Sequence, residues 1–97
     1  MLLKAAAADP ANAVTFSNLG VALQKQGRTA EAIGCYERAI ALDPNSPETQ
    51  ANFAMALGEA GRKDEAIAHY RTALRLRPDW PEVATALHAL VKRQENR

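Results

Sequence analysis

The sequence has little of what most active sites need. It holds one cysteine, Cys35, and two histidines, His69 and His88. A lone cysteine excludes an internal disulfide bond and fits a reducing compartment, so we expect a cytoplasmic protein. Three such side chains fall short of the roughly four ligands of a structural zinc site, and no third group is evident to orient a Cys–His pair for catalysis. We therefore expect no cofactor, no metal and no enzymatic activity.

Aromatic residues and net charge are also scarce, at 5% and +1. A nearly neutral chain lacks the basic footprint that nucleic acids and anionic membranes attract. Its longest apolar run is far shorter than the roughly 20 residues of a membrane span. Neither nucleic acid nor membrane is expected as a partner. Alanine, by contrast, is the most abundant residue type of the chain. This composition favours closely packed helices in a single small domain.

The chain contains an internal repeat. Residues 13–46 align without gaps to residues 47–80, with thirteen identities. These are Thr15/Thr49, Asn18/Asn52, Ala22/Ala56, Leu23/Leu57, Gly27/Gly61, Arg28/Arg62, Glu31/Glu65, Ala32/Ala66, Ile33/Ile67, Tyr36/Tyr70, Ala39/Ala73, Leu42/Leu76 and Pro44/Pro78. Pro10 and Pro81 continue the same register at the two ends. We therefore divide the chain into the second half of an incomplete repeat (1–12), repeat 1 (13–46), repeat 2 (47–80) and a C-terminal capping helix (81–97).

Each unit has the signals of a helical hairpin. Asn12, Ser46 and Trp80 stand just before the first helix, where the first two are good N-caps. Gly27 and Gly61 are placed to end that helix in the left-handed conformation. A second helix is predicted over about 29–42 and 63–76, and the proline two residues later ends each unit. Arg28 and Arg62 follow the turn glycines, where we expect them to pair with a nearby acid or to solvate the loop.

The repeat resembles the tetratricopeptide repeat. The first unit carries the residues of that pattern as Phe16, Leu19, Gly20, Leu23, Ala32, Tyr36, Ala39 and Pro44, and the second as Phe53, Ala54, Leu57, Ala66, Tyr70, Ala73 and Pro78. The resemblance implies an all-α fold, an antiparallel helix-hairpin solenoid with a right-handed superhelix. Small residues such as Ala32 are expected where helices cross closely, and Tyr36 and Tyr70 between units. Gln50 stands where the pattern has a bulky residue, so looser packing is expected there.

The resemblance also implies a concave groove lined by the first helices, which binds a peptide or protein segment. The candidate groove residues are Ser17, Asn18, Val21, Gln24, Lys25, Ala51, Asn52 and Met55. The two asparagines resemble those of the repeat arm of O-linked N-acetylglucosamine transferases, where one amide per unit lines the groove. An amide donates and accepts, so it can bind extended peptide backbone. Local hydrogen bonding is the alternative interpretation of Asn18 and Asn52.

A second groove chemistry of the family does not fit. Some tetratricopeptide proteins grip the terminal carboxylate of chaperones with lysines, an arginine and asparagines. In one register Ser17, Val21, Glu82 and Ala86 stand where that pattern has Lys, Asn, Lys and Arg, and in the other Glu48 and Asn52 replace its Lys and Arg. The sequence therefore does not predict a carboxylate clamp.

Two further hypotheses concern the context of the chain. One treats it as a targeting arm cut from a larger enzyme such as a glycosyltransferase. The other is self-assembly, since Leu2 and Leu3 belong to a half hairpin that lacks its partner helix, which allows a homodimer through the incomplete N-terminal repeat. The polar tail 92–97 is expected to act as a solvating cap at the other end.

Overall fold

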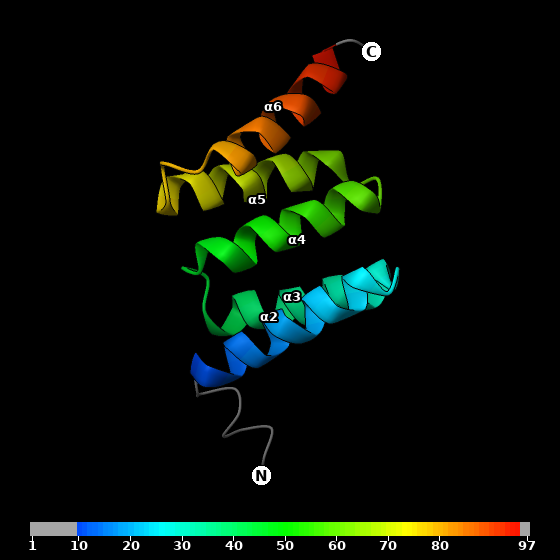
Figure 1. Cartoon of the computed structure of the whole chain (residues 1–97), viewed down its shortest axis with the longest axis vertical. Coiled ribbons are helices and arrows are strands. Elements are labelled where there is room, and N and C mark those ends of the chain that lie inside the picture. The colour runs from blue at the N-terminus through cyan, green and yellow to red at the C-terminus, as the bar shows by residue number, and fades with distance from the viewer. Residues whose placement is uncertain (1–9, 96–97) are drawn as a thin grey trace.

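A computed structural model describes residues 10–95 of the chain. Over this range the chain forms five helices and no strand: α2 (Pro10–Lys25), α3 (Thr29–Leu42), α4 (Pro47–Glu59), α5 (Lys63–Leu76) and α6 (Pro81–Glu95). Each helix packs against the next, and α2 also contacts α4 (Figure 1). The result is an elongated stack, 50 × 28 × 18 Å. The predicted all-α hairpin solenoid is confirmed. The prediction for residues 1–9 lies outside the described residues.

The turns inside the hairpins follow the sequence signals. Gly27 and Gly61 have φ angles of 80° and 82°. Residues with a Cβ atom rarely adopt such angles, whereas glycine adopts them readily. The following amides, Arg28 N–H and Arg62 N–H, donate to the carbonyls of Leu23 and Leu57 at 2.9 and 2.8 Å, as in a helix C-terminal motif. The second helices then begin and end where predicted.

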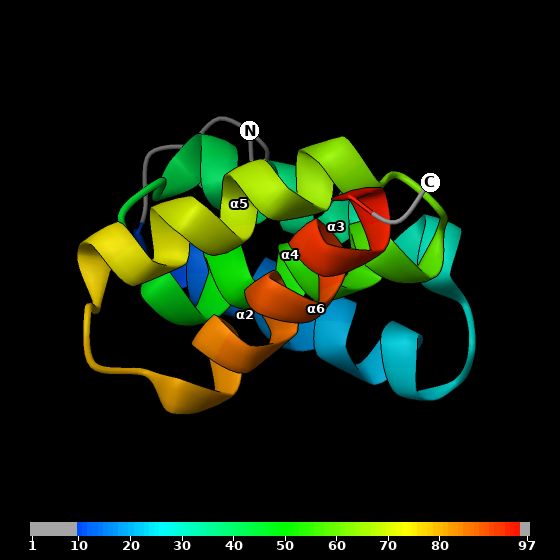
Figure 2. The same ribbon diagram turned by 90° about the horizontal axis from the view of Figure 1, so that it is seen from above.

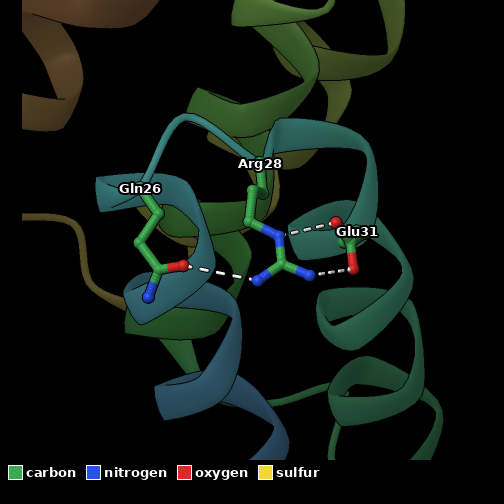
Figure 3. Close-up of polar contacts among 3 residues, drawn as sticks. All are labelled: Gln26, Arg28 and Glu31. Atoms are coloured by element: carbon green, nitrogen blue, oxygen red, sulfur yellow. Dashed lines mark hydrogen bonds and ion pairs between the residues drawn. The ribbon is translucent and has the colours of Figure 1, made fainter.

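The arginine after each turn forms the expected ion pair. Arg28 donates to both carboxylate oxygens of Glu31 at 2.7 Å, with Gln26 as a further acceptor at 3.4 Å (Figure 3). The equivalent Arg62 and Glu65 are joined at 2.7 and 2.8 Å. These pairs lower the pKa of both carboxyl groups. They are solvent-exposed, so they fix the turn locally and add little stability.

The start of α2 differs from the prediction. The helix begins at Pro10, so Asn12 lies inside it rather than capping it, whereas Ser46 does cap α4 by accepting from Thr49 N–H at 3.3 Å. In repeat 2 the turn before α4 is held by the Gln50 amide, which donates to the Pro44 carbonyl at 2.9 Å. Phe16 takes the place of Gln50 in repeat 1 and offers no such donor. Proline is well suited to a first helical position, since its missing N–H has no partner to lose.

The core is built between the units as expected. Tyr36 is fully buried in a cluster with Ala32, Phe53 and Leu57, which spans repeats 1 and 2. Tyr70 lies in a second cluster with Ala54, Ala73 and Val83, which joins repeat 2 to α6. Each unit therefore buries its apolar side only through its neighbour, as a stacked repeat must.

The expectation of looser packing at Gln50 is wrong. Only 4% of this residue is exposed. While its amide nitrogen donates to Pro44, its oxygen lies 2.7 Å from His69 Nδ1 and accepts from that ring. The His69 ring in turn packs on Phe53, with centroids 4.5 Å apart. A polar residue fits this position because both ends of its amide are hydrogen-bonded.

This buried contact makes stability depend on pH. Burial lowers the pKa of His69 below its ordinary 6.5, with Glu65 as a smaller opposing influence. The unfolded chain therefore binds the proton more readily, so stability is complete above about 6.5 and falls as the pH drops through that value towards the folded pKa. Thermal unfolding of the wild type should show this loss, and His69→Gln should flatten it. The ion-paired Glu31 and Glu65 titrate below 4.5, outside this window. Equal slopes for the two proteins would contradict the assignment to His69.

Candidate functional site

The first helices of the units share one side of the stack. Seen along the stack, α2, α4 and α6 lie on one side and α3 and α5 on the other (Figure 2). We call the outward surface of α2 and α4 the first-helix face. It consists of the candidates that remain accessible: Asn18, Val21, Lys25, Asn52 and Met55.

The two asparagines are the polar groups best placed on this face. Asn18 is exposed on α2, and Asn52 is half-buried at the equivalent position of α4. No side-chain hydrogen bond joins either amide to another residue in the described range 10–95. This observation favours amides that are available to a ligand over the alternative of local hydrogen bonding. Each offers one acceptor and two donors.

Apolar side chains lie beside these amides. Met55 is three residues beyond Asn52 on α4, and 48% of it is exposed. Val21 is three residues beyond Asn18 on α2 and is half-buried against the first core cluster. Residues three apart on a helix share a face, so each helix presents an amide followed by an apolar group. Methionine adapts its shape to different partners.

Two predicted groove residues do not reach the surface. Ser17 is 8% exposed and Ala51 is 6% exposed, so both lie in helix contacts. The Ser17 oxygen accepts a hydrogen bond from Thr49 Oγ1 at 3.0 Å, a buried link between α2 and α4. The resemblance placed both residues towards the groove, but Ser17 is covered where α2 meets α4, and Ala51 is buried in the second core cluster with Tyr70 and Val83.

Gln24 is half-buried and engaged within the protein. Its oxygen accepts from the Tyr36 hydroxyl at 2.7 Å, and its nitrogen donates to Glu59 Oε1 at 3.3 Å. Thr29 also donates to Glu59, at 3.4 Å. Burial, with Glu59 and Cys35 as smaller influences, raises the pKa of Tyr36 to about 12, so the hydroxyl stays protonated and keeps donating. We assign Gln24 to joining the units rather than to ligand contact.

Charged groups frame the first-helix face. Lys25 is exposed at the end of α2. At the start of α4, Glu48 pairs with Arg77 at 3.5 Å, and Arg77 also stacks over Trp80 with 4.4 Å to the ring centroid. Sequence reasoning missed Arg77, because the equivalent position of repeat 1 holds Asp43 and gives no signal. Trp80 is half-buried and packs against the second core cluster.

Residues 10–95 contain no group of three or more His, Cys, Asp or Glu side chains that could hold a metal ion. None of the five described helices is both long and apolar enough to cross a bilayer.

Comparison with known proteins supports the repeat assignment. Two tetratricopeptide repeat family models match the chain, one at residues 13–46 and the other at residues 35–68. The first match coincides with repeat 1, and the second runs from α3 through α4 into α5. The chain belongs to the tetratricopeptide repeat family. No curated protein matches it significantly in sequence.

A solved structure shares the whole arrangement. It is the second tetratricopeptide domain of Spaghetti (RPAP3), bound to the HSP90 peptide SRMEEVD. Its sequence is 25% identical to this chain, and the match covers 87% of this chain and 78% of that one, with a TM-score of 0.82. The stacking of α2 to α6 is therefore that of a tetratricopeptide domain. None of the comparisons shows a relationship to O-linked N-acetylglucosamine transferases.

Proposed function

We propose that the chain is a non-catalytic interaction module that binds an extended peptide segment on the first-helix face. The observation that carries this proposal is the pair of amides, Asn18 and Asn52, that stand at equivalent positions of adjacent units without a partner among residues 10–95. Because stacked units repeat along the axis, a peptide lying across α2 and α4 meets the same amide twice. Peptide backbone offers a donor and an acceptor at every residue, which matches an amide without requiring a particular sequence.

The similarity to the Spaghetti domain supports peptide binding in general terms. That domain is seen with a peptide whose last four residues, EEVD, include three acids. The charges on and beside the first-helix face of this chain do not favour an acidic ligand. Glu48 lies on α4 and Glu82 on α6, while Lys25 is the one cation of α2. We therefore propose a ligand that is not strongly acidic and that places apolar side chains near Met55 and Val21.

Removal of both amides tests this proposal. A phage-displayed library of linear peptides selects a ligand on the wild-type protein, and calorimetry then measures its dissociation constant. Asn18→Ala combined with Asn52→Ala should raise that constant about tenfold or more, because each lost hydrogen bond contributes roughly 0.5–1.5 kcal/mol. The matched control is Asn45→Ala, which removes an exposed amide from the turn before α4. Circular dichroism checks that all variants remain folded.

Three outcomes contradict the proposal. The library yields no binding peptide, or the double variant binds the selected peptide as tightly as the wild type. The third is that Asn45→Ala weakens binding as much as the double change does. Amide chemical shifts measured on titration give a second readout. The peptide should perturb residues of α2 and α4, and it should leave α3 and α5, on the other side of the stack, unchanged.

A further inference from the structure

The helices α2, α4 and α6 share one apolar face, which a neighbouring helix covers on α4 and α6 but which is exposed on α2. On α4, Phe53 is 5% and Ala56 is 0% exposed, because α3 packs over them with Tyr36 in the shared cluster. On α6 the equivalent residues, Leu87 and Leu90, are half-buried, because they pack against the cluster that contains Tyr70 and Ala73 of α5. The equivalent positions of α2 carry Leu19, which is 47% exposed, and the exposed Ala22. We call Leu19 and Ala22 the open face.

From this contrast we infer that the open face is a dimer interface that packs against the open face of a second copy of the chain. Leu19 and Ala22 lie three residues apart on one helix, so they form a single apolar surface. In repeat 2 the equivalent residue, Phe53, is buried against a helix, α3. A helix is therefore the shape that this face accepts.

The charge distribution favours another α2 as that helix. Lys25, at the last position of α2, is its one charged residue, whereas α4 carries Glu48 and Glu59 and α6 carries charges at both ends. Two α2 helices packed antiparallel about a two-fold axis keep the two lysines at opposite ends of the contact. The small side chain of Ala22 allows the helix axes to approach to the usual roughly 8–10 Å.

The two ends of the stack explain why association should stop at two copies. The outer side of α6 presents the exposed His88, where the two full units have the buried small residues Gly20 and Ala54. A head-to-tail contact would place the apolar open face against this polar end and would leave an open face at the end of every filament. Like-to-like packing of the open faces is isologous and closes as a dimer.

Sedimentation velocity over a wide range of protein concentration tests the inference. The wild type should shift from monomer to dimer as its concentration rises. Leu19→Glu should weaken the dimer about a hundredfold or more, because it buries a charge without a partner. Met55→Glu is the matched control: Met55 is 48% exposed, nearly the same as Leu19, but lies on the first-helix face. Helical circular dichroism confirms that both variants are folded.

Each alternative gives a distinct result. A wild type that stays monomeric throughout overturns the proposal, and so does a dimer that Leu19→Glu leaves intact or that Met55→Glu weakens equally. A chain that begins at Pro10 tests the competing occupant, which is residues 1–9. The proposal expects this truncated chain to dimerise as the full chain does. Dimerisation that appears only after truncation would assign the open face to residues 1–9 of the same chain, and loss of the dimer on truncation would make those residues the contact.

Discussion

Leu57→Ala is expected to lower the free energy of unfolding by about 2–5 kcal/mol, the usual cost of removing a fully buried leucine. Leu57 is 0% exposed and lies in the cluster that joins repeat 1 to repeat 2. Its neighbours Tyr36 and Phe53 come from different units, so the cavity opens at the contact on which the stack depends. In a small repeat protein the contact between units carries much of the total stability, since no unit buries its apolar face alone.

The repeat supplies a matched control for this change. Leu23 stands at the equivalent position of repeat 1 but is only half-buried. Leu23→Ala makes the same chemical change in the same helix position, and it should cost distinctly less because less surface is removed from the core. Urea unfolding followed by circular dichroism measures both variants. Equal losses would show that the two positions are packed alike, contrary to the structure.

Much of the fold could be predicted from the sequence, because the same turn and helix signals occur at equivalent positions of both repeats. Gly27 and Gly61 set the turns, and the helices between them begin and end where propensity and proline place them. The residues at the crossings, such as Ala32 and Tyr36, are buried as the pattern implies. These positions depend on local conformation and on contacts between neighbouring units, and the period of the repeat encodes both.

The errors arise where the two units differ in one residue. Gln50 and Phe16 share a position, and only Gln50 has an amide that holds the turn before its helix. Asn12, expected as an N-cap, lies inside α2. Leu19 and Phe53 also share a position, but only Phe53 has a described helix over it. Periodicity alone treats such positions as equivalent, whereas their burial depends on the neighbour that each one meets.

A role of the candidate groove residues in binding stays a prediction, and the structure bears only on their accessibility. The resemblance to tetratricopeptide repeats placed Asn18, Asn52, Val21 and Met55 on the groove side of the first helices, and the structure leaves them at least partly accessible. Spacing could not show that Ser17 pairs with Thr49, or that Gln24 is taken by Tyr36 and Glu59. These contacts depend on the distance between neighbouring helices and on the side chains that face each other across it. The spacing of residues along one helix contains neither piece of information.

The two glycines inside α2 and α4 should respond to alanine with opposite signs. Gly20→Ala is expected to destabilise the protein by about 1–3 kcal/mol through overpacking, although alanine is the better helix former. A Cβ atom at Gly20 would lie 2.7 Å from Cε1 of Tyr36 and 2.9 Å from two other ring atoms. That ring is fully buried and its hydroxyl is bound to Gln24, so it cannot move aside without breaking a contact.

Gly58→Ala should instead stabilise the protein, by roughly 0.5–1 kcal/mol. A Cβ atom there would meet only the Ala66 Cβ, at 4.0 Å, an ordinary contact. The helix gains the propensity difference between glycine and alanine and loses nothing in packing. Thermal and urea unfolding of both variants measure the two signs. A stabilised Gly20→Ala would mean that the Tyr36 ring can shift freely, and the close approach of α2 and α3 would then not account for a glycine at that position.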